Sequence, residues 1–578
     1  MRRHALPWLG ILAMLLAACG PAATATPAPS ATPRATATPG GAPLPTATAT
    51  ARPTVAPTVA KPTPTTGPTP GGVLKIPLTG EPTSWDPVNR LNPTLMTKGN
   101  VFSYLMTLWP DPPKPGCESA VGKVLVKDWR YVDDRTAEFT ILQGIKYQNK
   151  PPLNGREVTA QDIVFSFERW RNQDYLKSKF ELVKSVEAVD KYTFRMTSSI
   201  PWGGMVIELV AHPYGPMATP AEDGGPKGDL WENPEKSWVG SGPFTFEKWI
   251  PGVRWVLAKN PTYWRMGRPL IDGLEFVVIP ELSTQMAAMR SGKINMAHAW
   301  QDLQVEDVVR TIPGLQVIRC PSASTFPGNL FMNTEGPPFN DVRVRRAVSM
   351  AIDRQALVTG PHLGKATVTG ILRPGVPYAV TLDQMPPESR QYLEYHPDRA
   401  KQLLAEAGYP KGFKTVMNGT TRYVQHNYRA VWEATAEMLG RVGIDAKLNF
   451  MEYGQFSATV LQAKYPIGEF GMSPNLQLTP EDSLALANAS KYAGVVNRSK
   501  VNDPEYDRLF EQFMSSNDEA KRTEIARQLQ LRQIDQAYRV VMPMASDLLV
   551  TTPELHVTGY MAHGQEMFPV FETAWISR

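Results

Sequence analysis

The chain has 578 residues, of which 60 are Lys or Arg, 55 are Asp or Glu and 42% are hydrophobic. Residues 1–70 hold five of the basic residues and no acidic one, so residues 71–578 carry 55 of each sign and no formal net charge. This balance argues against a nucleic-acid-binding protein, which needs a basic surface. Residues 71–578 are also too many for one compact core, because domains usually hold about 50 to 250 residues, so we expect two or three domains.

The first residues of the chain have the pattern of an export signal. Arg2 and Arg3 precede the apolar run Ala5–Leu16, which is too short for a membrane helix of about 20 residues. The tetrapeptide Leu-Ala-Ala-Cys that ends at Cys19 resembles the bacterial lipobox. We therefore predict a signal peptide over residues 1–19 with Cys19 as the lipid attachment point. The alternative is a plain secretory signal with an incidental cysteine.

Residues 20–70 are nearly all Ala, Thr, Pro and Gly. Such a segment cannot bury enough apolar area to offset the entropy of ordering, so we expect a disordered tether with polyproline II character. A lipid at one end and a spacer behind it predict an extracytoplasmic, membrane-anchored protein. That oxidising setting permits a disulfide between Cys117 and Cys320, which the sequence leaves open.

The residues after the tether predict a mixed α/β chain. In its first half, alternating apolar residues and turn signals indicate mainly strands. The elements expected there are a strand within 71–87, a helix over 94–108, a strand over 136–142, a helix after an N-cap at Thr159, two strands within 184–196, two within 238–264, and a strand and a helix within 271–297. The helix after Thr159 should bury one face, formed by Ile163, Val164, Phe167 and Trp170.

Helices become more frequent beyond Cys320. The expected elements are an amphipathic helix over 341–358, helices over 396–413 and 429–442, a strand over 444–450 and further strands after Pro543. Gly408 should end the second of these helices, because glycine readily adopts the left-handed conformation of a C-terminal cap. Strands that alternate with helices at this spacing indicate α/β organisation.

The sequence contains no recognisable catalytic or metal-binding constellation. The eight histidines include no i, i+4 pair, and no Cys pair accompanies them. The segment Gly240–Phe244 (GSGPF) has neither the Lys-Ser/Thr of a phosphate loop nor a G-x-S-x-G elbow. We therefore expect no enzyme, no metal site and no cofactor. Most tryptophans should lie in the core, but Trp85, in a turn, is a candidate for lining a ligand cleft.

Five stretches of the chain resemble, in family order, the extracytoplasmic solute-binding proteins of ABC importers, family 5, which includes dipeptide-, oligopeptide- and nickel-binding proteins. The stretches are EPTSWDP (81–87), DDRTAEFTILQGIKYQNKPPLNGREVTAQDIVFSFERW (133–170), VGSGPFTFEKWIPGVRWVLAKNPTYW (239–264), FMNTEGPPFNDVRVRRAVSMAIDRQAL (331–357) and AKQLLAEAGYPKGF (400–413). We expect the resemblance that they carry to extend over nearly all of residues 71–578.

The resemblance implies a two-lobed α/β fold of the periplasmic-binding-protein type II kind, with an extra N-terminal subdomain (class C). Lobe one would hold residues 71–322, with the subdomain at about 115–238, and would take the tail 546–578; lobe two would hold 323–545. Two crossings between the lobes would form a hinge. Ligand in the cleft would favour a closed monomer that docks on an ABC permease and ATPase complex, the lipid anchor keeping it at the membrane.

The resemblance also locates the ligand-binding loop. Peptide binders of the family hold the peptide ammonium with an aspartate before a helix of lobe two, and the carboxylate with Arg or His. Aligned by eye, Asn475 takes the aspartate position, Glu469 falls where an arginine can sit, and Met472 replaces an aromatic residue. Asn427 lies near the position of a family histidine. On this alignment, three charged anchors for peptide termini are absent or reversed.

Peptide nevertheless stays the default ligand, because Asp482 or His426 could substitute for a missing anchor. The alternatives are an oligosaccharide, an opine-like compound or a metal chelate. The candidate ligand-binding residues are Thr83, Ser84, Trp85, Arg422, Tyr423, Met472, Ser473 and Asn475, each of which could instead serve packing or a solvated loop.

Two functions of other classes remain open. One is an envelope-tethered hydrolase, because sequence spacing alone does not exclude a spatial triad. The other is a sensor-associated or scaffold lipoprotein on the same fold, which would bind a receptor instead of feeding a permease.

Overall fold

The structure of the protein, a computed structural model, describes residues 68, 70–82, 84–88, 92–107, 121–171, 180–211, 217–220, 233–298, 302–321, 328–422, 427–474, 479–485, 497–558, 560–563, 566–569 and 571–577. The predicted signal peptide, Cys19 and nearly all of the tether lie outside these residues. Within the described ranges, no helix has the length and apolar character needed to cross a bilayer.

The first sheet has four strands in the order β1-β10-β9-β8. β1 (Val73–Leu78) runs parallel to β10 (Gly273–Val278), whereas β9 (Arg254–Lys259) and β8 (Phe244–Ile250) pair antiparallel. These strands confirm the alternation predicted within 71–87, 238–264 and 271–297. α1 covers Asn92–Val101, shorter than the helix expected over 94–108, because residues 106–107 already form strand β2 (Met106–Thr107).

A second sheet has the order β11-β19-β12 and contains strands far apart in the sequence. β19 (Met544–Thr551) pairs antiparallel with both β11 (Met296–His298) and β12 (Gln316–Pro321). The helices α5 (Leu282–Arg290) and α6 (Asp302–Thr311) share a hydrophobic cluster with this sheet. The short strand β14 (Ala366–Thr367) also pairs with β19.

Residues 122–198 contribute an antiparallel sheet in the order β4-β5-β7-β6. Its strands are β4 (Val126–Tyr131), β5 (Thr136–Ile141), β6 (Val183–Asp190) and β7 (Thr193–Ser198). α2 (Ala160–Arg171) packs on this sheet and buries Ile163, Phe167 and Trp170 as predicted, while Val164 is only partly buried. Phe139 and Phe194 stack in the same core with ring centroids 4.6 Å apart.

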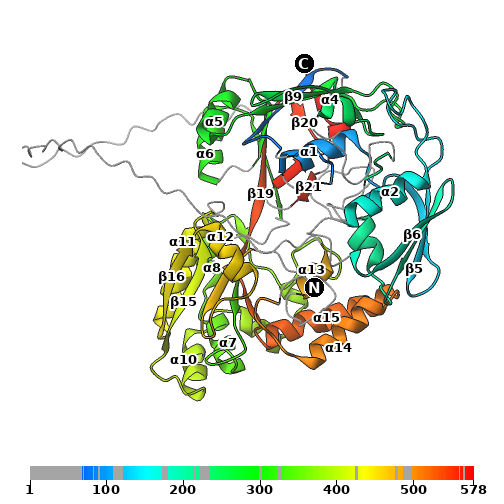
Figure 1. Ribbon diagram of the computed structural model, residues 1–578. Helices are drawn as coiled ribbons and strands as arrows, with labels where there is room; N and C mark the ends of the chain where they lie inside the picture. Colours follow the sequence, from blue (N-terminus) through cyan, green and yellow to red (C-terminus); the bar gives the residue numbers. More distant parts are fainter. Residues whose placement is uncertain are drawn as a thin grey trace, which may run out of the picture. The chain divides into compact units, whose positions relative to one another are not determined.

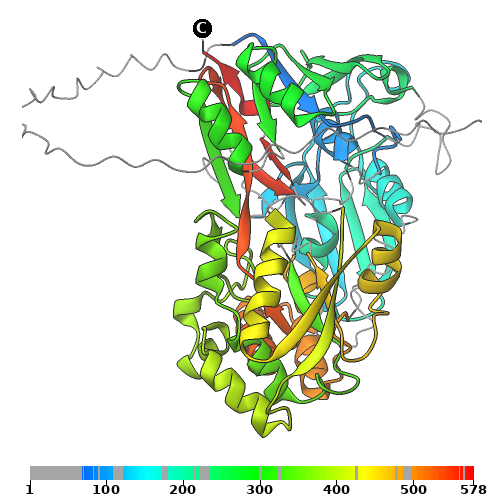
Figure 2. The same cartoon turned by 90° about the vertical axis from the view of Figure 1, so that its left-hand side faces the viewer.

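The last large sheet has five strands in the order β16-β15-β17-β13-β18. β15 (Phe413–Thr420), α11 (Tyr428–Arg441) and β16 (Ile444–Met451) form a parallel β-α-β unit, and Figure 2 shows α11 in yellow against these strands. β17 (Phe470–Ser473) is parallel to β15, and β13 (Asn329–Met332) is antiparallel to β17 and β18 (Arg539–Val541).

The helix predicted over 341–358 is two helices, so this prediction is wrong in its continuity. α7 (Val342–Met350) begins at the N-cap Asp341, and α8 (Arg354–Thr359) begins at a second N-cap, Asp353, whose carboxylate accepts from the Ala356 amide. A capping aspartate competes with helix continuation by bonding to the backbone. α10 (Pro397–Glu406) ends as predicted before Gly408, whose φ is +92°.

Three further helices pack against the β4–β7 sheet. They are α13 (Pro480–Leu484), α14 (Pro504–Ser515) and α15 (Glu519–Asp535), and their buried faces belong to the same hydrophobic cluster as α2 and β5. The smaller elements are β3 (Gly122–Lys123), α4 (Pro234–Ser237), α9 (Pro387–Arg390), α12 (Tyr453–Phe456), β20 (Leu555–His556), β21 (Tyr560–His563), β22 (Glu566–Pro569) and β23 (Trp575–Ile576).

The chain passes between the five-stranded sheet and the β11-β19-β12 sheet twice. β12 precedes β13, and β18 precedes β19 after only Met542 and Pro543. In Figure 1 the red strand β19 leads away from the elements around α8 and α11 toward those around α5 and β20.

Candidate functional site

The two faces of the five-stranded sheet differ in character. Successive side chains of a strand point to opposite faces. One face carries Leu330, Met332, Phe470, Met472 and Val540, all members of a single hydrophobic cluster. On the three strands β13, β17 and β18, the alternate positions carry Asn329, Phe331, Gly471, Ser473, Arg539 and Val541.

The strand register places these alternate residues side by side. Asn329 is opposite Ser473, and Phe331 lies between Gly471 and Arg539. We call Asn329, Ser473 and Arg539 the polar face of the sheet. Their exposed fractions are 2%, 0% and 4%, so this polar face is buried in the structure.

A second arginine, Arg498, reaches the polar face from outside the sheet. Its Nη1 donates to Ser473 Oγ at 3.2 Å, and its guanidinium carbon lies 5.6 Å from the centroid of the Phe331 ring. Arg539 Nη2 lies 3.4 Å from the carbonyl oxygen of Ser483 and 3.5 Å from that of Ile371, at the long limit of a hydrogen bond. Burial lowers the pKa of Arg539 to about 10.

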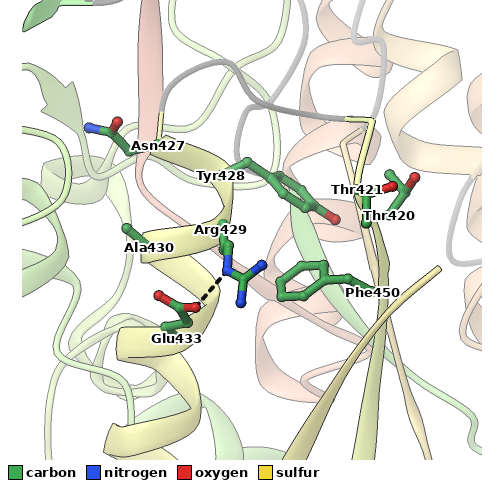
Figure 3. Close-up of a pocket in the computed structure, with 8 residues that line it drawn as sticks. All are labelled: Thr420, Thr421, Asn427, Tyr428, Arg429, Ala430, Glu433 and Phe450. Carbon is green, nitrogen blue, oxygen red and sulfur yellow. Dashed lines mark hydrogen bonds and ion pairs between the residues drawn. The ribbon is translucent and has the colours of Figure 1, made fainter. Parts of the chain in front are cut away.

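A pocket of about 440 Å³ opens at the carboxyl ends of β15 and β16, beside the first turn of α11 (Figure 3). Its lining residues are Thr420, Thr421, Asn427, Tyr428, Arg429, Ala430, Glu433 and Phe450. In open α/β sheets, ligands bind outside the carboxyl ends of parallel strands. The position of the pocket therefore matches the usual place of a ligand site.

The pocket wall combines aromatic and charged groups. Tyr428 Oη donates to the Met472 carbonyl oxygen at 3.2 Å, which ties the first turn of α11 to β17. Arg429 Nε donates to Glu433 at 2.8 Å, and the Arg429 guanidinium lies 5.3 Å from the Phe450 ring (Figure 3). Because Arg429 is largely exposed, this ion pair adds little stability and leaves both charges available to solvent.

The structure separates the predicted ligand-binding residues. Ser473 lies on the polar face, whereas Met472 is on the opposite, hydrophobic face. Arg422 is exposed and its guanidinium lies 4.3 Å from the Tyr453 ring. Ser84 is exposed, and its hydroxyl accepts from the Asp86 amide at 3.1 Å. The remaining candidates Thr83, Tyr423 and Asn475 lie outside the described residues, as does His426.

Trp85 lies in the core of the first sheet and is only 4% exposed. Four aromatic rings surround it edge-on at centroid distances of 5.3 to 5.5 Å; they belong to Trp238, Phe246, Trp249 and Trp255. This surrounding favours the packing alternative for Trp85, and a ligand contact by this residue stays a prediction.

The other aligned positions have structural partners. Glu469 accepts from Asn418 Nδ2 at 2.7 Å, and Asn427 donates to the Pro361 carbonyl oxygen. Cys320 is disulfide-bonded; the other two cysteines of the chain, Cys117 and Cys19, lie outside the described residues. Among the residues that the structure describes, no group of three His, Cys, Asp or Glu could hold a metal ion.

Sequence reasoning did not identify Asn329, Arg498 or Arg539. One signal for Arg539 was present: it begins the otherwise apolar run RVVMPMA (539–545). A charge in a buried strand needs a partner, so it marks a position worth testing. Asn329 gave no such signal, because only strand pairing brings it beside Ser473. Arg498 gave none either, because it lies outside the strands and reaches Ser473 from a loop.

Comparison with known proteins is consistent with this architecture. Residues 120–494 match the model of the bacterial extracellular solute-binding proteins, family 5. The glutathione-binding protein GsiB of Salmonella paratyphi A is 30% identical over 348 residues, which are 59% of this chain and 63% of that protein's length. The heme-binding protein A of Haemophilus influenzae is 26% identical over 457 residues, 76% of this chain and 81% of that protein.

Solved structures show the same fold. HbpA2 from Haemophilus parasuis superposes with a TM-score of 0.73 at 20% identity, over 88% of this chain and 100% of that one. DppA from Helicobacter pylori, solved with the peptide STSA, gives a TM-score of 0.65 at 22% identity, over 88% and 99%. These likenesses confirm the predicted α/β fold of class C binding proteins. The match to the family model covers more than half of the chain, which therefore belongs to family 5 of the bacterial extracellular solute-binding proteins.

Proposed function

We propose that this protein is the solute-binding component of an ABC importer, tethered to the membrane through Cys19, and that it captures a small solute and delivers it to a permease. The observation that carries this proposal is the position of the pocket and the polar face. Both lie on the five-stranded sheet, which the chain joins to the β11-β19-β12 sheet by two connections. A ligand held there would bias the equilibrium between open and closed forms.

On this proposal the body has two lobes. Lobe one holds residues 71–322 and 546–578, with the extra subdomain at about 115–238, and lobe two holds residues 323–545. The β12–β13 and β18–β19 connections supply the hinge. Two separate connections restrict the motion to opening and closing, as in other two-lobed binding proteins.

Peptide remains the first ligand class to test, and non-peptide solutes are the alternative. Relatives of both kinds exist: DppA was solved with a peptide, while GsiB and heme-binding protein A carry the names of other ligands. The aligned positions Asn475 and Glu469 lack the charges that peptide binders use, which supports testing glutathione, heme and opines beside dipeptides and oligopeptides.

The decisive experiment identifies the solute directly. Purified protein is analysed by mass spectrometry for co-purifying small molecules, and each candidate is then tested by thermal shift and calorimetry. We expect saturable binding of at least one solute, which is released unchanged. Conversion of the solute into a product would instead support an envelope hydrolase, and binding to a receptor domain without any solute would support a scaffold lipoprotein.

The tether is tested separately by cell fractionation. The wild-type chain should sediment with membranes and incorporate radiolabelled fatty acid, whereas Cys19→Ala should lose both properties. Equal labelling of the two chains would overturn the role of Cys19 without affecting the solute-binding proposal.

A further inference from the structure

A tight turn follows strand β7 and carries two consecutive glycines. We call residues 202–205, with the sequence WGGM, the glycine turn. The Gly203 amide donates to the carbonyl oxygen of Met514, near the end of α14, at 2.5 Å. On the other side, Tyr131 Oη of β4 donates to the Gly203 carbonyl oxygen at 2.5 Å. The backbone of one residue therefore joins the β4–β7 sheet to α14.

The two glycines are required by the close approach of neighbouring elements. A Cβ on Gly203 would lie 1.7 Å from the Ser516 carbonyl oxygen, and a Cβ on Gly204 would lie 1.8 Å from Glu481 Oε1. Neither glycine has a positive φ, so the backbone conformation alone would accept other residues. Only the absence of a side chain lets the glycine turn fit between α13 and the end of α14.

Apolar side chains surround this contact. Trp202 and Met205 of the glycine turn, and Phe513 and Met514 of α14, are each no more than 3% exposed and belong to one hydrophobic cluster. In Figure 1 the orange helices α14 and α15 lie next to the cyan elements β5 and β6 of the sheet. Because buried apolar area stabilises a contact, separating the glycine turn from α14 would be unfavourable.

The contact joins the two lobes of the proposed function. The glycine turn belongs to lobe one, whereas α13, α14 and α15 belong to lobe two. All residues of the contact lie outside the β12–β13 and β18–β19 connections, so the contact is a further, noncovalent link between the lobes. A rotation that separates the lobes about these connections would have to break it.

We propose that the glycine turn is a latch that holds the two lobes together in the closed form, even without a solute. This inference rests on the proposed solute-binding function and adds a conformational device to it. Contacts made only in the closed form favour that form, so the solute has to supply less of the free energy of closure. Release of the solute requires the latch to open.

Distances between two spin labels test the latch in the full chain. Lys184 in β6 and Gln528 in α15 are exposed, and each is replaced by cysteine for labelling. Co-purifying molecules are removed by partial unfolding in urea and refolding. Pulsed electron paramagnetic resonance then gives the distribution of distances, with singly labelled chains as the background. We expect the solute-free wild type to show mainly the one distance that this structure gives.

The variants weaken the latch in two different ways. Gly203→Ala should add a longer distance and raise the ratio of open to closed forms at least about tenfold, because its Cβ overlaps the Ser516 carbonyl oxygen only in the latched form. Tyr131→Phe, which lacks the hydroxyl that donates to Gly203, should raise this ratio about fivefold, and it serves as the test should Gly203→Ala fail to fold. Gly440→Ala in α11 is the matched control, because the space around that glycine is open, and it should leave the distribution unchanged.

The outcomes separate the latch from the solute-binding function. A solute-free wild type that shows mainly a longer distance would overturn the latch, as would a wild-type distribution in Gly203→Ala or, where that variant does not fold, in Tyr131→Phe. Saturable binding of a solute in calorimetry would leave the proposed function intact in either case. Failure to bind any solute would overturn the function and not the latch, because the distances are measured without solute.

Discussion

The buried ion pair between Glu481 and Arg522 should be sensitive to the loss of either partner. Both side chains are 3% exposed, and Arg522 Nη2 lies 2.9 Å from Glu481 Oε1. Arg522 also donates to the Phe513 carbonyl oxygen at 2.7 Å and to Tyr378 Oη at 3.1 Å. The pair joins α13 to α15 in the cluster that packs on the β4–β7 sheet.

Arg522→Met should destabilise the protein by about 3–5 kcal/mol, because it leaves the Glu481 carboxylate buried without its counter-charge. The carboxylate lies close against the turn at Gly204, since a Cβ on Gly204 would be only 1.8 Å from Glu481 Oε1. The double variant Glu481→Leu with Arg522→Met should recover most of this loss, because replacing a whole buried pair with apolar residues is often neutral.

Urea unfolding followed by tryptophan fluorescence and by circular dichroism measures both variants. The double variant should unfold at a higher urea concentration than Arg522→Met alone. A loss below about 1 kcal/mol for Arg522→Met, or a double variant as unstable as the sum of the two single ones, would refute the reasoning.

Three further predictions concern other positions. Burial lowers the pKa of Lys98 to about 7, so above that pH the unfolded chain holds a proton that the folded chain lacks. Between pH 7 and 9, the unfolding free energy of the wild type should therefore rise relative to that of Lys98→Met by up to about 1.4 kcal/mol per pH unit, as measured by urea unfolding. Trp85→Ala should lower the unfolding free energy by about 3–5 kcal/mol through lost packing, and an unchanged melting temperature would contradict this. Gly204→Ala should destabilise the protein, because the added methyl group would displace Glu481. The control is Gly440→Ala in α11, where the space is open, and it should raise the unfolding free energy measured by calorimetry by up to about 1 kcal/mol.

The sequence predicted local structure well where the deciding interactions are local. The buried face of α2 and the glycine stop after α10 follow from side-chain periodicity and backbone preference within one segment. The break between α7 and α8 was missed because Asp353 fits a helix by pattern yet acts as an N-cap. Both outcomes depend on interactions within a single short segment of the chain.

The candidate site was harder to predict because register decides it. Met472 and Ser473 are adjacent in sequence, yet one lies in the hydrophobic cluster and the other on the polar face. A shift of one residue would exchange them, and the pairing that fixes the register joins Asn329 to Ser473 and Val541, far away in the chain. Trp85 illustrates the same limit, since its place in a turn suggested a cleft, while the structure surrounds its ring with four others and leaves a ligand contact as a prediction.

The proposed hinge begins directly after a strand whose end is firmly held. Arg539 begins β18, and β19 starts in the other sheet after only two intervening residues. The Val541 carbonyl oxygen, at the end of β18, accepts from Arg354 Nε at 2.8 Å, so the strand is held firmly in the five-stranded sheet up to the connection. The segment that must bend is therefore short and begins at a fixed point. Since a ligand shifts a conformational equilibrium only by its difference in affinity between the two states, a solute favours closure only where it binds the closed form more tightly than the open form.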